Sequence, residues 1–256
     1  MSSAYNQFKD LHQSLLILPN IWDAKSASII EEQKFPAAAT SSKAVANTLG
    51  YEDGQQMSFE EYFFVVKRII ASVKIPVTVD MEMGYGSTNE EILVNMQRLA
   101  ELGVAGINIE DSSITNSVRG LKDAETFAAT IEYIKNKLIS KNLNLFINLR
   151  CDTYILNVPN KQQETNNRLK LYNNSGADGI FLPCITAEND IAEAISNTKL
   201  PLNVMCIPGL PDLDTLKKLG VKRVSMGPFL FSKIYNNIAP LLQTMKESKS
   251  VSVFLS

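Results

Sequence analysis

Eight short apolar runs recur along the chain, and each is followed by a longer segment with the residue spacing of an amphipathic helix. Runs this rich in Val, Ile and Leu predict strands covered on both faces, as in parallel sheets wrapped by helices. The runs cover residues 15–20, 37–42, 77–82, 106–111, 145–150, 179–184, 201–206 and 223–228. Eight strand–helix units within 256 residues predict an α/β fold, a single (β/α)8 TIM-type barrel.

A doubly wound open sheet is the alternative arrangement of the same elements. Open sheets of this kind more commonly carry a glycine-rich nucleotide-binding fingerprint after the first strand. Here the first run leads into residues 20–28, NIWDAKSAS, which contain no glycine. The sequence therefore favours the closed barrel.

Helix boundaries are marked by capping residues. Ser58, with Glu61 three positions later, matches a capping box at the start of residues 58–73, and Thr88 precedes an acidic first turn in residues 89–103. Glycine stands where three helices should stop before the next strand, at Gly103, Gly176 and Gly220.

One domain over residues 1–256 is expected, with residues 1–14 as an N-terminal lead-in and residues 229–247 as a C-terminal helix. The two longest insertions, residues 43–57 and 112–121, follow the second and fourth strands. In a barrel both insertions overhang the catalytic face.

Charge and composition exclude several functions. The chain has 25 basic and 27 acidic residues and no basic run, so nucleic acid is not an expected partner. The polar N-terminus and the absence of an apolar run of about 18 residues predict no signal peptide and no membrane segment. Three widely spaced cysteines fit free thiols, which favours a cytoplasmic protein. The only histidine, His12, is expected on the surface of the lead-in segment.

Acidic residues end two successive predicted strands, where barrel active sites form. Asp80 and Glu82 end the third strand, and Glu110 and Asp111 end the fourth. A lone acid at a strand end more often caps a helix or faces solvent, but several acids packed together repel one another unless a cation is present. We therefore predict a Mg²⁺ site at Asp80, Glu82 and Glu110, with some ligands acting through water.

Blocks of sequence over nearly the whole chain resemble the isocitrate lyase/phosphoenolpyruvate mutase superfamily, in family order. They are residues 18–27, 37–54, 79–91, 103–112, 146–154, 176–184, 200–209 and 220–228. The specific blocks are VDMEMGYG and GINIED, and the similarity is greatest to the short oxo-acid lyase-like branch. The resemblance implies a (β/α)8 barrel, a Mg²⁺ cofactor replaceable by Mn²⁺, a small carboxylate substrate, and a homodimer or homotetramer with an exchanged C-terminal helix.

The resemblance also assigns roles to acids at the predicted site. It implies that Asp80 is the direct metal ligand, and that Glu82, Glu110 and Asp53 hold metal-bound waters. Asp53 and Glu110 are accordingly expected in the catalytic machinery. Taken alone, Asp53 reads equally well as a turn residue before Gly54.

Substrate-binding residues follow from the same blocks. Ser41, Ser42 and Lys43 match the family's loop that binds the substrate carboxylate and oxo group partly through backbone. Arg150 matches the substrate-binding arginine, which is also expected in catalysis because a guanidinium binds a carboxylate bidentately. Asn116 lies in Thr-Asn-Ser, which echoes a phosphonomutase loop.

Departures from the family pattern bear on the reaction. Isocitrate and methylisocitrate lyases carry a Lys-Lys-Cys-Gly-His loop, but residues 112–122 contain neither Cys nor His. Ile114 stands where the phosphonomutase loop has Lys, and Glu82 stands where the family usually has Asp.

The leading hypothesis is a Mg²⁺-dependent lyase that cleaves a carbon–carbon bond of a small 2-oxo or 2-hydroxy carboxylate through a metal-stabilised enolate. The alternatives are a phosphonopyruvate or phosphoenolpyruvate mutase- or hydrolase-type enzyme, and a carboxylate-binding relative without catalysis. A turnover screen on 2-oxo acids separates the last class from both enzymes.

The missing Cys and His predict that the purified protein does not cleave isocitrate or 2-methylisocitrate, because the acid/base group of those lyases is absent. A coupled assay for glyoxylate or pyruvate release measures this. Turnover of either substrate at ~1–10³ s⁻¹, the usual enzymatic range, would contradict our interpretation of residues 112–122.

Overall fold

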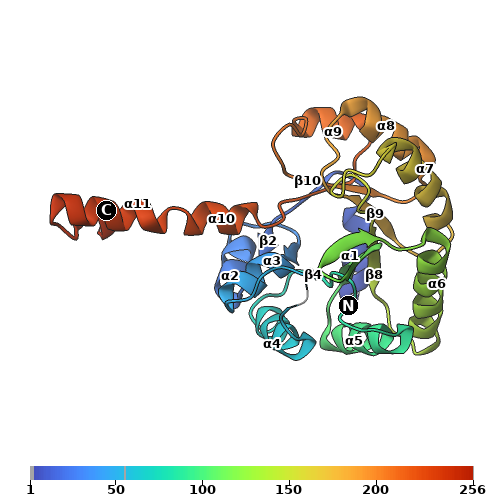
Figure 1. The fold of residues 1–256 in the computed structure, drawn as a ribbon. Coiled ribbons are helices and arrows are strands. Elements are labelled where there is room, and N and C mark those ends of the chain that lie inside the picture. Colours follow the sequence, from blue (N-terminus) through green and yellow to red (C-terminus); the bar gives the residue numbers. More distant parts are fainter. Residues whose placement is uncertain (1–2, 55, 256) are drawn as a thin grey trace.

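The structure is a computed structural model that describes residues 3–54 and 56–255. Its main sheet is parallel at every strand pair among the described residues and follows the order β1-β11-β10-β9-β8-β5-β4-β3-β2. The two end strands, β1 (Leu16–Leu18) and β2 (Asn20–Ile21), are neighbours in the chain and flank Pro19, so the sheet closes on itself (Figure 1). The predicted (β/α)8 barrel is confirmed, and the open sheet is excluded.

The remaining strands of the barrel fall within the eight predicted runs. They are β3 (Ala38–Thr40), β4 (Val77–Asp80), β5 (Gly106–Glu110), β8 (Phe146–Arg150), β9 (Gly179–Leu182), β10 (Leu202–Met205) and β11 (Arg223–Ser225). The helices are α1 (Ala4–Leu11), α2 (Ala24–Glu32), α3 (Ser42–Thr48), α4 (Phe59–Ile70), α5 (Asn89–Leu102), α6 (Ala124–Ser140), α7 (Lys161–Tyr172), α8 (Glu188–Asn197), α9 (Leu213–Leu219), α10 (Phe229–Tyr235) and α11 (Ile238–Ser248), followed by the short 3-10 helix η1 (Ser252–Phe254). No helix among the described residues is both long enough and apolar enough to cross a bilayer.

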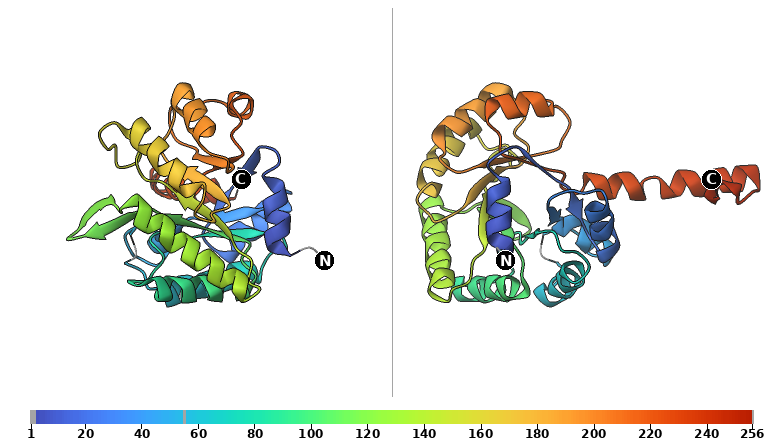
Figure 2. Two further views of the ribbon diagram at one scale, coloured as in Figure 1. Left: turned by 90° about the vertical axis from the view of Figure 1, so that its right-hand side faces the viewer. Right: turned by 180° about the vertical axis from the view of Figure 1, so that it is seen from behind.

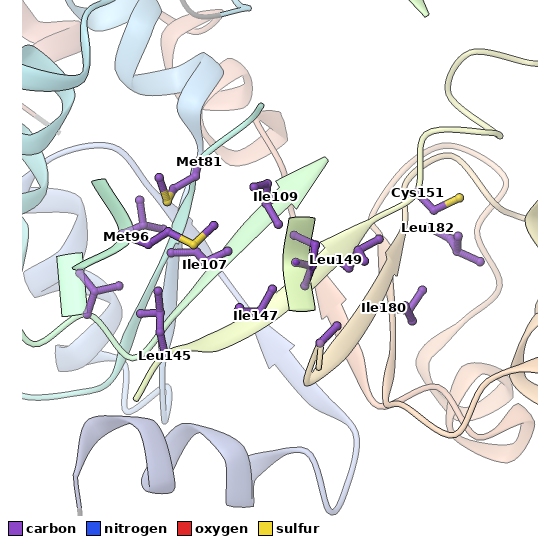
Figure 3. Close-up of a cluster of buried hydrophobic side chains, with 14 of the residues drawn as sticks. Met81, Met96, Ile107, Ile109, Leu145, Ile147, Leu149, Cys151, Ile180 and Leu182 are labelled. Atoms are coloured by element: carbon purple, nitrogen blue, oxygen red, sulfur yellow. The ribbon is translucent and has the colours of Figure 1, made fainter. Parts of the chain in front are cut away.

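Side chains alternate strictly along the central strands. Ile107 and Ile109 of β5 point outward into the core beneath the helices, as do Ile147 and Leu149 of β8 (Figure 3). The residues between them are asparagines that face the barrel interior, where Asn148 Nδ2 donates to Asn108 Oδ1 at 2.9 Å. The apolar outer face holds the helices, and the interior is left unusually polar.

The predicted helix signals are present. Ser58 and Glu61 form a reciprocal capping box at α4, and Thr88 forms another at α5. Gly103 and Gly220 adopt left-handed backbone just after α5 and α9, where an added Cβ would be strained. These caps fix where each helix returns the chain to the next strand.

The insertion at residues 112–121 forms an antiparallel hairpin that the sequence analysis did not predict. Its strands are β6 (Ser112–Thr115) and β7 (Val118–Leu121). The two turn residues, Asn116 and Ser117, both have positive φ (50° and 63°), which is the geometry of a tight type I′ turn. Without glycine at the second position, the usual hairpin signal is missing.

The N-terminal lead-in is a docked helix, and the surface position expected for His12 is wrong. His12 is 8% exposed, stacks on Phe146 at 4.5 Å between ring centroids, and binds the Phe8 carbonyl oxygen through Nδ1 at 2.9 Å. Phe8 and Phe146 belong to an apolar cluster with residues of β1 and β3. The hydrogen bond within its own helix lets the imidazole enter this cluster.

The C-terminal segment is two helices, rather than the single helix predicted over residues 229–247. α10 ends at Tyr235, and α11 starts after Asn237 with Pro240 in its first turn, where proline is tolerated. Both helices extend away from the barrel (Figure 2). α11 has no buried residue and exposes Ile238, Leu241 and Leu242. The predicted homodimer or homotetramer stays a prediction, and this apolar arm is consistent with it.

The burial of His12 predicts a specific loss of stability in acid. Burial, and then the charge of Arg223, lower the pKa of His12 to about 4, below its ordinary 6.5. Its stabilising contribution is therefore complete above pH 6.5 and is lost as the pH falls through 4, by about 3 kcal/mol in total. His12→Phe keeps the stack without the titration, so its unfolding free energy should fall less between pH 7 and 4. Parallel curves for both proteins in urea titrations would contradict this.

Candidate active site

A pocket of about 230 Å³ opens at the carboxyl ends of the barrel strands, where enzymes of this fold bind substrates. Its charged lining residues are Lys43, Asp53, Asp80 and Arg150. Its other lining residues are Asn20, Ser41, Ser42, Asn108, Ile155, Phe181, Pro183, Met205, Ser225, Gly227, Pro228 and Phe229. Six of the predicted site residues, Ser41, Ser42, Lys43, Asp53, Asp80 and Arg150, are thus brought together from four loops and strand ends.

Asp80, the last residue of β4, is held on both carboxylate oxygens. Ser42 Oγ donates to its Oδ2 at 2.8 Å, and Asn108 Nδ2 lies 3.3 Å from its Oδ1. Its backbone N–H donates to Thr40 Oγ1 at 3.0 Å. Ser42 therefore uses its hydroxyl to orient Asp80, which leaves its backbone N–H as the group that matches the predicted substrate loop.

Arg150, the last residue of β8, is fixed by two buried acids. Its Nε donates to Asp152 Oδ1 at 2.6 Å, its Nη2 lies 3.3 Å from Asp152 Oδ2, and its Nη1 lies 2.9 Å from Glu110 Oε2. The two contacts with Asp152 are hydrogen bonds, whereas the contact with Glu110 is an ion pair in which Glu110 Oε2 has no hydrogen-bond partner. N–H donors of the Arg150 guanidinium therefore remain for a ligand. Asp152, which is fully buried, was missed because it follows the predicted strand end by two residues.

Glu110 is buried behind the pocket and is neutralised by arginine. Besides Arg150, it pairs with Arg119 of the hairpin strand β7, and Arg119 also lies 3.7 Å from Asp152 Oδ2. Burial raises the pKa of Glu110, and the charges of the two arginines oppose that shift. Arg119 was not predicted as a site residue, because only the hairpin turn carries it back to the end of β5.

Glu82 is buried beside the pocket and does not line it. Its backbone has φ 50°, its Oε1 accepts from Tyr85 Oη at 2.9 Å, and its Oε2 is buried with no hydrogen-bond partner. Desolvation, followed by the charges of Asp80 and Asp53, raises its pKa to about 8. The Glu82 carboxyl group is therefore close enough to Asp80 and Asp53 for their negative charges to raise its pKa.

Asp53 and Lys43 are exposed at the pocket mouth. Desolvation and the nearby charge of Asp80 raise the pKa of Asp53, while Lys43 and Arg150 act in the opposite direction. Ser41 caps helix α3, its side chain accepting from the backbone N–H of Ala44. The geometry thus gathers negative charge at Asp53 and Asp80, with positive charge facing it.

Two acidic or polar residues singled out from the sequence lie elsewhere. Asn116 is exposed at the hairpin tip and is not among the described residues that line the pocket. Asp111, the neighbour of Glu110, points outward because side chains alternate along a strand. It is fully buried against α7, where it accepts from Arg168 at 3.0 Å and Tyr172 at 2.7 Å. Asp111 therefore supports the helix layer.

Of the three acids predicted to hold Mg²⁺ directly or through water, only Asp80 lines the pocket. Among residues 3–54 and 56–255, no three His, Cys, Asp or Glu side chains are placed to hold a metal ion. Glu110 is bound by arginines, and Glu82 is turned toward Tyr85. The residues still fit Mg²⁺ with one direct protein ligand, because Asp80 faces the pocket near Asp53 and the unpartnered oxygen of Glu82.

Comparison with known proteins gives the same family as the sequence blocks. The family model for phosphoenolpyruvate phosphomutase matches residues 8–246. An uncharacterized protein of Mycobacterium tuberculosis is 35% identical over 227 residues, 88% of this chain and 83% of that protein. Oxaloacetate decarboxylase 1 of Pseudomonas fluorescens is 28% identical over 208 residues, 79% of this chain and 70% of that protein.

A solved structure agrees on the fold. Phosphoenolpyruvate phosphomutase from Streptomyces platensis subsp. rosaceus superposes with a TM-score of 0.86 at 17% identity, over 98% of this chain and 90% of that chain. The molecule is thus a TIM-type barrel with a polar pocket at its catalytic rim. The chain belongs to the phosphoenolpyruvate phosphomutase family, within the phosphoenolpyruvate mutase/isocitrate lyase superfamily of mutases and lyases.

Because Asp111 is buried against α7, its replacement by alanine should lower the stability of the fold strongly. Asp111→Ala removes the buried partner of Arg168 and leaves it only the more exposed Glu164, which should lower the unfolding free energy by up to about 3–5 kcal/mol. Asp123→Ala, which removes the exposed N-cap of α6, serves as a control and should cost much less, because only one exposed capping hydrogen bond is lost. Adding Arg168→Met to Asp111→Ala should recover part of the loss. A loss below that of the control, in denaturant titrations, would show that the pair contributes little.

Proposed function

We propose that this protein is a Mg²⁺-dependent lyase that cleaves a carbon–carbon bond of a small 2-oxo carboxylate. The supporting observation is the pocket itself, where the carboxylates of Asp80 and Asp53 face the guanidinium of Arg150 within about 230 Å³. Such a site suits a small anionic substrate bound together with a cation. Decarboxylation of a 3-carboxy-2-oxo acid such as oxaloacetate is the first reaction to test, and a decarboxylase of that substrate is among the relatives.

The metal supplies one part of the chemistry. When bound at Asp80, Mg²⁺ provides a Lewis acid that stabilises negative charge as it develops on the 2-oxo oxygen of the substrate. Ser42 and Asn108 keep the Asp80 carboxylate in place through their hydrogen bonds.

The chain's own residues supply binding and orientation. Arg150 presents its remaining N–H donors to a substrate carboxylate, and it is oriented by hydrogen bonds to Asp152 and by the charge of Glu110. Ile155, Phe181 and Phe229 add apolar side chains to the pocket lining, which would limit the hydration of the carboxylate that is lost. Asp53, at the mouth and with a raised pKa, is the group we assign to returning a proton to the enolate carbon.

Decarboxylation also fits what the hairpin lacks. The isocitrate and methylisocitrate lyases use a Cys of this loop as acid/base, and residues 112–122 contain neither Cys nor His. Loss of carbon dioxide needs only a stabilised enolate and a final proton. Phosphonopyruvate or phosphoenolpyruvate chemistry is disfavoured because Ile114, at the position of the phosphonomutase Lys, packs toward Gly54 and brings no charge.

The test is Mg²⁺-dependent release of pyruvate from oxaloacetate, corrected for the spontaneous reaction. Asp80→Ala should lower kcat/KM by at least about 10²-fold and abolish Mg²⁺ binding in calorimetry, because the direct ligand is gone. Glu52→Ala, an exposed acid beside Asp53, is the matched control and should change neither.

Other outcomes favour the alternatives. Unchanged Mg²⁺ affinity in Asp80→Ala would reject Asp80 as the ligand. Turnover of phosphonopyruvate alone would favour the mutase or hydrolase. Mg²⁺ and oxalate binding without turnover of any 2-oxo acid would favour a carboxylate-binding protein.

A further inference from the structure

A large cationic side chain lies inside the barrel beneath the pocket. Arg223 of β11 is 1% exposed, and it has the largest of the fully buried side chains among the described residues. It alternates with Val224, which packs in the outer core, so Arg223 points inward. Its guanidinium carbon lies 5.6 Å from the centroid of the Phe8 ring, on the side away from the pocket.

This charge is poorly compensated. Its Nε and Nη1 have no hydrogen-bond partner, and no carboxylate of the described residues forms an ion pair with it. Asn203, its register partner on β10, is also buried with both amide atoms unpartnered. A buried charge without a partner costs several kcal/mol, so an apolar residue would stabilise the barrel better.

One short chain of polar contacts leads from Arg223 to the pocket. Its Nη2 lies 3.4 Å from Asn108 Oδ1, and Asn148 Nδ2 donates to the same oxygen at 2.9 Å. Two donors on Oδ1 orient the Asn108 amide, so its Nδ2 faces Asp80 Oδ1 at 3.3 Å. Burial lowers the pKa of Arg223 to about 9 and the charge of Asp80 opposes this, so Arg223 is a cation at neutral pH.

We propose that Arg223 is a positioning residue whose buried positive charge, relayed by Asn108, offsets the negative charge at Asp80 and shifts the pocket's preference from cations toward anions. Interior charges are weakly screened, so the effect reaches the pocket without contact with the ligand. The inference rests on the proposed function for the identity of its two probes, Mg²⁺ and a small carboxylate.

The experiment is calorimetry on Arg223→Met, in which Asn148 still orients Asn108. Mg²⁺ alone should bind about tenfold more tightly than to the natural protein, and oxalate at saturating Mg²⁺ about tenfold more weakly. A merely structural role would weaken both together. Arg223→Lys keeps the charge and should restore both affinities toward those of the natural protein.

Two further variants complete the test. Lys222→Met removes the neighbouring charge, which binds the Gln13 carbonyl at the opposite rim, and should leave both affinities within about twofold. Arg223→Gln replaces Arg223→Met if that variant does not fold. Parallel changes of both affinities, or no change, would overturn the inference.

The unmutated protein separates this inference from the proposed function. If it binds no Mg²⁺, the metal-dependent function fails. The inference on Arg223 is then judged by oxalate alone, whose affinity must still fall in Arg223→Met. If the unmutated protein binds neither probe, both proposals are rejected.

Discussion

The pairing of β1 with β11 is the constraint on which the rest of the molecule depends, because it joins the two ends of the sheet. Pro19 interrupts the first strand, so that its halves pair with β11 and β3. Closure makes every strand end on one rim, and this rim brings Asp80 and Arg150 together although 70 residues separate them. Closure also makes one face of each strand point into the barrel. The polar side chains on these inner faces therefore gather beneath the pocket.

The ionisable groups at the rim divide into two sets. Glu110 and Asp152 are buried and form ion pairs with arginines. These two acids orient the Arg150 side chain. Asp80 and Asp53 line the pocket and form no ion pair with an arginine among the described residues, so their carboxylates remain available there. The first set orients Arg150, and the second is the pair of carboxylates at which we propose that a cation binds.

Strand-end positions could be predicted from the sequence, because apolar runs and capping residues are local signals. The opposite faces of Glu110 and Asp111 follow from the alternation of side chains along a strand, which is a local signal of the same kind. Other features depend on contacts that no local pattern encodes. Arg119 reaches Glu110 only through an Asn-Ser turn without glycine, and His12 enters the core only because its own helix satisfies its Nδ1.

The central claim is that Asp80 and Arg150 bracket a metal-bound small carboxylate. The most direct measurement is a crystal structure with Mn²⁺ and oxalate, using the anomalous signal of the metal. Our account predicts a single strong peak beside the Asp80 carboxylate, with oxalate between that peak and the Arg150 guanidinium. A peak elsewhere on the barrel, or oxalate bound away from Arg150, would contradict it.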